Sequence, residues 1–160
     1  MSLLQRLNLL NDTLARLLSS LQGPALLAIR LWVGWQFFKA GMLKVESWES
    51  TLYLFEEEYR VPLLSPHVAA IAGTAGELLF PLLLWAGVAT RLAALGLSAV
   101  NVMAVVSYAH VLLSEGFEAA FAQHVLWGAL LLAVVIWGGG RFALDALAAR
   151  SGGERQRLGT

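Results

Sequence analysis

The sequence predicts an all-α membrane protein: a four-transmembrane-helix bundle with an N-terminal amphipathic interfacial helix and a short outer-surface helix. Of its 160 residues, 58% are hydrophobic and only 14% are charged, against about 25% charged residues in a typical soluble protein. The mean hydropathy is +0.68. Such a chain has too few polar side chains to cover a soluble fold. Its formal net charge is zero, so we expect no nucleic acid among its partners.

Four apolar stretches are long enough to cross a hydrocarbon layer of about 30 Å at about 1.5 Å per residue. Backbone polar groups in lipid have to be satisfied within the segment, so each stretch should be a helix. Together the spans form one transmembrane domain over residues 23–150. The predicted spans are 24–43, 68–88, 92–112 and 121–140.

Three segments outside the spans have patterns of their own. Residues 1–22 carry leucines at helical spacing between polar residues, which predicts an amphipathic helix lying on the membrane. A coiled coil or a helix packed on the bundle would have the same pattern. In the outer loop 44–66, apolar residues from Trp48 to Tyr59 recur every three or four positions and predict a short surface helix. The polar segment 151–160 is expected to be a disordered cytoplasmic tail.

The distribution of basic residues predicts that both termini lie in the cytoplasm. Seven arginines flank one side of the predicted spans, and the side richer in basic residues normally stays in the cytoplasm. Lys44 and Arg60 are the basic residues clearly on the other side. The seven are Arg6, Arg16, Arg91, Arg141, Arg150, Arg155 and Arg157.

The first span carries two cations that need a reason to lie in the membrane. At about 100° per residue, they share one face with two glycines and a phenylalanine. The glycines allow a second helix to approach closely, so the cations are expected to face the bundle interior. The five residues are Arg30, Gly34, Phe37, Gly41 and Lys44.

Glu77, near the middle of the second span, is the most informative residue. Pro81, four positions later, cannot donate a hydrogen bond to the carbonyl of residue 77, so a carboxylate and a freed carbonyl coincide. One interpretation is a ligand, proton or cation site. The other, which we favour without excluding the first, is an ion pair between Glu77 and Arg30 that joins two helices.

The third and fourth spans carry further polar residues. Asn101 and Tyr108 belong to a polar stripe that serves either interhelical hydrogen bonding or ligand contact. His110 and His124 lie at outer ends of spans and could hold a metal ion or haem. We prefer an interfacial or pocket-lining role, because the chain has no cysteine and no paired-histidine spacing.

Near the cytoplasmic rim, Arg141 and Asp145 lie one helical turn apart and predict a local ion pair. No nucleotide-binding loop, metalloprotease motif or catalytic triad is present in the sequence. The sequence therefore does not decide whether the protein is an enzyme. If it is redox-active, it is expected to be a subunit of a quinone-linked oxidoreductase.

Several short motifs, in this order, resemble the DoxX family of small bacterial membrane proteins over about residues 24–148. They are the face from Arg30 to Lys44, Gly76-Glu77-Leu78-Leu79, Gly87-Val88-Ala89-Thr90-Arg91 and Gly138-Gly139-Gly140-Arg141-Phe142-Ala143-Leu144-Asp145. In the last motif, Ala143 stands where the family pattern has serine. The resemblance implies a bacterial inner-membrane protein linked to quinone or redox chemistry. Relatives are similar to the membrane subunit of a thiosulfate:quinone oxidoreductase, and others are associated with thiol and oxidative-stress systems.

The function expected from these observations is binding of a quinone-like ligand, by a membrane subunit of a redox or stress-related system. Glu77 would be the proton carrier if the ligand is reduced there. A carrier or permease for a small solute or metal ion is an alternative, as is a scaffold that recruits a partner protein. Expected partners are lipid, a second copy and a redox protein. The candidate ligand-binding residues are Arg30, Phe37, Lys44, Glu77, Asn101, Tyr108, His124 and Trp127.

Overall fold

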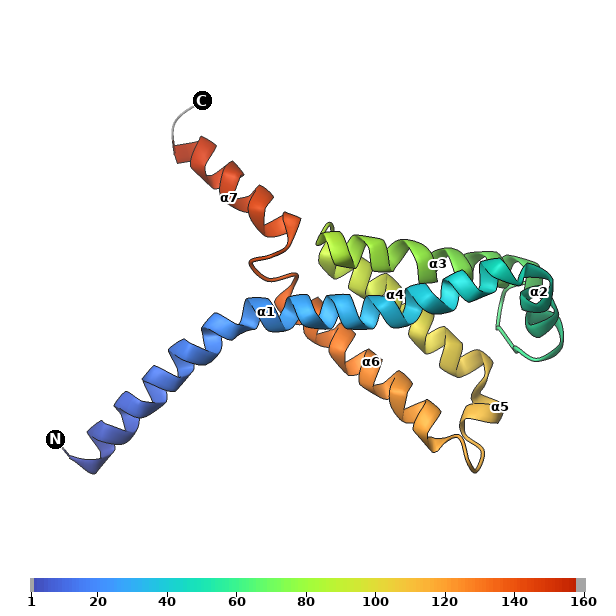
Figure 1. The fold of residues 1–160 in the computed structure, drawn as a ribbon, viewed down its shortest axis with the longest axis horizontal. Helices are drawn as coiled ribbons and strands as arrows, with labels where there is room; N and C mark the ends of the chain where they lie inside the picture. The colour runs from blue at the N-terminus through green and yellow to red at the C-terminus, as the bar shows by residue number, and fades with distance from the viewer. Residues whose placement is uncertain (1, 158–160) are drawn as a thin grey trace.

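The computed structural model describes residues 2–157 and consists of helices joined by short connections (Figure 1). Four of the helices are long and apolar enough to cross a membrane: α1, α3, α4 and α6. The predicted all-α fold with four candidate spans is therefore confirmed. The helices are α1 (Leu3–Glu46), α2 (Trp48–Glu57), α3 (Pro66–Ala86), α4 (Thr90–Ser107), α5 (Ala109–Leu112), α6 (Glu118–Trp137) and α7 (Leu144–Arg157).

Helix α1 joins the predicted amphipathic segment and the first span into one helix of 44 residues. Ser2 begins it with a capping box, in which Ser2 and Gln5 each accept a hydrogen bond from the other's backbone N–H. The N-terminal part projects away from the bundle (Figure 1). Its leucines, such as Leu10 and Leu14, are exposed, as they would be in a helix that covers its apolar face with lipid.

The bundle is built around the second half of α1, which packs against α3 and α6, while α4 lies between α3 and α6. Close approach depends on glycine: a methyl group on Gly41 would lie 2.9 Å from the side chain of Leu78 in α3. The centre is apolar and almost fully buried. Its members include Val33, Leu84, Leu97, Leu131 and Val134.

The connection after the third span differs from the prediction. Helix α4 ends at Ser107 rather than near residue 112, because Tyr108 leaves helical geometry at φ −116° and ψ 21°. The four-residue helix α5 follows, and α6 begins at Glu118. The short surface helix predicted in the first long loop is α2, which packs against α3.

At the end of the bundle away from α2 and α5, hydrogen bonds to Asp145 fasten the connection between α3 and α4 (Figure 1). We call this end the Asp145 end. Between α3 and α4 the backbone makes a tight turn, with φ of 70° at Gly87 and 45° at Ala89. Asp145 accepts hydrogen bonds from Ala89 N at 2.9 Å, Thr90 N at 2.8 Å and Thr90 Oγ1 at 2.7 Å. Its own N–H donates to the Gly87 carbonyl at 2.9 Å. These bonds fasten the start of α7 to the start of α4.

The predicted Arg141–Asp145 ion pair was wrong. The Asp145 carboxylate faces the start of α4, and the Arg141 guanidinium lies over the ring of Phe142, 4.9 Å from its centroid. Among the residues that the structure describes, the one ion pair joins Lys44 and Glu77. Asp145 caps α4 and does not pair with Arg141, because the first N–H groups of a helix have no partner within the helix and bind a carboxylate well.

Helix α7 continues to Arg157, although a disordered tail was expected for residues 151–160. The first half of α7 is rich in alanine and leucine, which have high helix propensity, and helical geometry continues from that half into the polar residues that follow. Residues 158–160 lie outside the described residues.

Replacing Gly87 by alanine should destabilise the protein, and Gly116→Ala is the matched control. Both glycines have positive φ, 70° and 90°, so both variants carry left-handed strain of about 1–2 kcal/mol. Only at Gly87 would the new methyl collide, 2.6 Å from Ala143 Cα, which adds about 1–3 kcal/mol. Thermal unfolding in one detergent should show a larger loss for Gly87→Ala. Equal losses would mean that the turn is not tightly packed.

Asp145 should make stability depend on acid pH. Its hydrogen bonds from Thr90 hold the pKa of the Asp145 carboxyl below the ordinary value of 3.8, helped by the Ala89 N–H and the Arg30 charge. A lowered folded-state pKa adds stability above the ordinary value, and this contribution is lost as pH falls through the lowered one. Asp145→Asn should therefore be less stable than the natural protein at pH 7, with the gap narrowing below about pH 4. Melting temperatures with a constant gap would contradict this.

Candidate ligand-binding site

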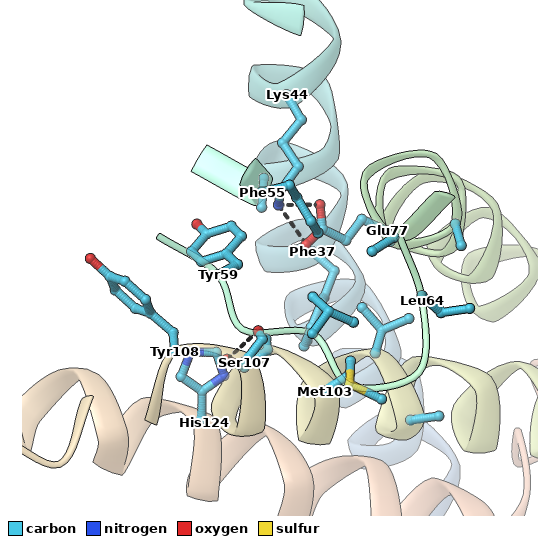
Figure 2. A pocket seen from close by; sticks show the side chains of 18 of the residues that line it. Phe37, Lys44, Phe55, Tyr59, Leu64, Glu77, Met103, Ser107, Tyr108 and His124 are labelled. Atoms are coloured by element: carbon cyan, nitrogen blue, oxygen red, sulfur yellow. Dashed lines mark hydrogen bonds and ion pairs between the residues drawn. The ribbon is translucent and has the colours of Figure 1, made fainter. Parts of the chain in front are cut away.

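A cavity of about 480 Å³ lies at the other end of the bundle, which we call the Lys44 end. This volume is within the range of about 300–1,000 Å³ that is usual for small-molecule sites. Its wall combines side chains from the four long helices, from the short helices α2 and α5, and from the loop after α2 (Figure 2). Most of the lining is apolar, including Phe37, Val100 and Met103. Such a wall suits an apolar or aromatic molecule with a small polar group.

The polar centre of the cavity is an ion pair between Lys44 of α1 and Glu77 of α3 (Figure 2). Lys44 Nζ lies 2.7 Å from Oε1 and 2.6 Å from Oε2 of Glu77. The two side chains are 21% and 10% exposed. Burying two charges with so little contact to solvent costs hydration free energy, and the attraction between the charges offsets that cost only in part. Both groups line the cavity.

The favoured Glu77–Arg30 pair was therefore wrong, and the direction of helical side chains explains the error. Side chains on a helix lean toward its N-terminus. Arg30 consequently reaches away from Glu77, while Lys44 reaches back toward it. Arg30 is fully buried at the Asp145 end, where it donates to the carbonyls of Leu84 at 2.8 Å and Phe142 at 3.4 Å.

Asn101 joins α4 to α6 through His124. Its Nδ2 donates to the His124 backbone carbonyl at 2.9 Å, and its Oδ1 lies 2.8 Å from His124 Nδ1. Asn101 is buried behind the cavity wall, whereas His124 is part of that wall. Of the two roles considered for Asn101, the structure shows the interhelical hydrogen bond.

The structure does not favour a metal centre at His110 and His124. His110 is exposed and stacks edge-on against Tyr108 at 5.4 Å, whereas His124 packs against Trp127 at 4.9 Å. Within the described residues, no group of three or more His, Cys, Asp or Glu side chains could hold a metal ion. The histidine pair therefore has no third protein ligand among those side chains.

An aromatic cluster of Phe55, Tyr59 and Tyr108 lines the cavity, and only Tyr108 of the three was a candidate from the sequence. The ring of Tyr59 lies 4.9 Å from Phe55 and 5.2 Å from Tyr108, both edge-on. The next residue, Arg60, donates its backbone N–H to the Ser107 carbonyl at 2.9 Å, which fixes the loop on α4. Burial raises the pKa of the Tyr59 phenol, and the nearby Tyr108, Glu77 and Glu58 raise it further.

The structure brings six of the eight candidate ligand-binding residues to this cavity: Phe37, Lys44, Glu77, Tyr108, His124 and Trp127. Arg30 and Asn101 are the two others. Sequence reasoning missed Gln36, Phe55, Tyr59, Met103 and Ser107, which also line it. The apolar spacing in the first long loop could have identified Phe55 and Tyr59, since it predicts a helix face that must cover something apolar.

Comparison with known proteins places the chain in a family. The DoxX family model matches residues 25–110, more than half of the chain. A protein of Haemophilus influenzae, described as an uncharacterized protein, is 27% identical over 132 residues, covering 78% of this chain and 83% of its own length. No solved structure matches the chain. With its four apolar helices, the chain is a small membrane protein that belongs to the DoxX family.

Proposed function

We propose that the protein binds a quinone-like molecule in the cavity at the Lys44 end, as a membrane subunit of a redox or stress-related system. The observation that carries this proposal is the Lys44–Glu77 ion pair in the wall of an otherwise largely apolar cavity. A quinone has the matching chemistry: a flat apolar ring with polar oxygens at its edge. The ring would pack against the aromatic side chains, and one oxygen would accept from the Lys44 ammonium.

The pair would also serve proton exchange, with Glu77 as the proposed proton carrier. Reduction of a quinone to a quinol takes up two electrons and two protons. We propose that the electrons come from a separate redox partner protein and that Glu77 relays the two protons in turn, taking each one from solvent and passing it to a ligand oxygen. Lys44 would hold the carboxylate in place and, by its opposite charge, stabilise the ionised form that remains after each transfer.

We also propose that the Asp145 end faces the cytoplasm of a bacterium and that the cavity lies near the opposite face of the inner membrane. Arg91 and Arg141 both lie at the Asp145 end. Basic residues normally remain on the cytoplasmic side of a membrane protein. A reactive tag added at the C-terminus should therefore be protected in intact spheroplasts.

Filling the cavity should expel the ligand. Gly73 lines the cavity, and a methyl group there would make only ordinary contact, 3.7 Å from Phe55. Gly73→Leu should therefore fold and carry at least about tenfold less co-purifying quinone, because the added side chain occupies the ring position. Leu79→Phe adds bulk to the exposed face of the same helix and should leave the quinone content unchanged. Equal contents in the two variants would contradict the proposal.

Removing the ion pair as a unit separates binding from folding. Single changes at Lys44 or Glu77 leave one buried charge without its partner and should destabilise the bundle. The double variant Lys44→Met, Glu77→Leu leaves no unpaired charge and should fold. It should bind a short-chain quinone about tenfold or more weakly, since a charge-assisted hydrogen bond is lost. Natural affinity in the double variant, measured by calorimetry, would show that the pair has only a structural role.

A further inference from the structure

Hydrogen bonds with Asn101 determine which ring nitrogen of His124 carries the hydrogen. The Asn101 side chain bridges two atoms of His124, its backbone carbonyl at 2.9 Å and its ring Nδ1 at 2.8 Å. A carbonyl oxygen only accepts hydrogen bonds, so the amide nitrogen of Asn101 must face it. The amide oxygen then faces Nδ1, and because that oxygen also only accepts, Nδ1 must carry the hydrogen.

The other ring nitrogen is consequently a hydrogen-bond acceptor. A neutral imidazole carries one hydrogen, so Nε2 of His124 has a free lone pair. Among the described residues, no donor reaches Nε2. His124 lines the cavity, close to Tyr108 and Ser107 (Figure 2). The cavity therefore offers an acceptor on α6, in addition to the ion pair between α1 and α3.

Trp127, one helical turn further along α6, packs against the His124 ring. Its indole Nε1 is buried and has no hydrogen-bond partner within the described residues. Its ring is fixed edge-on between His124 at 4.9 Å and Phe37 at 5.4 Å. Trp127 therefore contributes its ring surface to the cavity wall, beside the acceptor of His124.

We infer that the site prefers its ligand in the reduced, hydroxyl-bearing form, a quinol or related phenol, whose O–H donates to Nε2 of His124. This inference rests on the proposed function of the same cavity. A hydroxyl group donates to Nε2 and so satisfies this acceptor. A quinone carbonyl has no hydrogen to donate and would set two acceptors, its oxygen and Nε2, against each other. Asn101 acts as a positioning residue that keeps Nε2 unprotonated.

Binding of the two redox forms tests this preference. The probes are a benzoquinone carrying one isoprene unit and its quinol, titrated anaerobically into the detergent-solubilised full chain at mildly alkaline pH. The quinol should bind about tenfold more tightly, since one hydrogen bond is gained and one repulsive contact avoided. In Asn101→Leu the preference should fall toward equality, because the ring can then carry its hydrogen on Nε2.

A control on the same helix separates this effect from a general disturbance of α4. The hydroxyl of Ser98 donates to the Ala94 carbonyl within its own helix, so Ser98→Ala should retain the full preference for the quinol. Equal affinity for the two forms, or tighter quinone binding, in the natural protein would overturn the inference and leave the proposed function standing. Absence of binding by either form would defeat both.

The ring state can also be measured without any ligand. In a variant with His67→Gln and His110→Gln, His124 is the remaining histidine, and its nitrogen signals can be assigned by ¹⁵N magnetic resonance. Nδ1 should show the shift of a protonated nitrogen and Nε2 that of an unprotonated one. The reverse pattern at neutral ring charge would overturn the inference even if Asn101→Leu fails to fold.

Discussion

The Lys44–Glu77 ion pair restricts how α1 and α3 can pack, because two opposite charges inside an apolar bundle must lie close together. Neither charge could be left alone at this depth, because an unpaired buried charge would cost several kcal/mol, of the order of 3–5. The helices must therefore meet in the one register that joins the two side chains. Gly41, on the same face of α1, allows that close approach. The cavity lies beside the pair and is lined by both residues.

The two ends of the bundle differ, because the Lys44 end holds the candidate cavity whereas hydrogen bonds fasten the connections at the Asp145 end. At the Asp145 end, the Arg30 Nη atoms donate to the carbonyls of Leu84 and Phe142, and the Asp145 carboxylate accepts from the start of α4. Between Arg30 and Lys44 along α1 lie Val33 and Phe37, both buried in the apolar core. A carrier would need polar groups along a continuous path, and this layer interrupts the path. For this reason we propose a site that binds from one side and not a conduit.

Much of the fold could be predicted from the sequence, because hydropathy and helix length follow directly from the bilayer. The cavity residues Lys44, Glu77, His124 and Trp127 were also identifiable, since polar residues in apolar helices stand out. The partners of those residues were not. Counting helical rise places Arg30 and Glu77 close together, but counting does not give the axial offset between helices or the lean of long side chains. Asp145 was assigned to Arg141 because capping across distant segments has no local signal.

Photoaffinity labelling tests the central claim, that the cavity at the Lys44 end binds a quinone-like molecule, most directly. Membranes containing the natural protein would be illuminated with an azido-substituted quinone, and the labelled peptides identified by mass spectrometry. The label should lie on residues that line the cavity, such as Phe37, Met103 and Trp127, and an excess of unmodified quinone should prevent it. Labelling confined to exposed residues of the bundle, such as Leu79 and Leu132, and unaffected by competitor would contradict the claim.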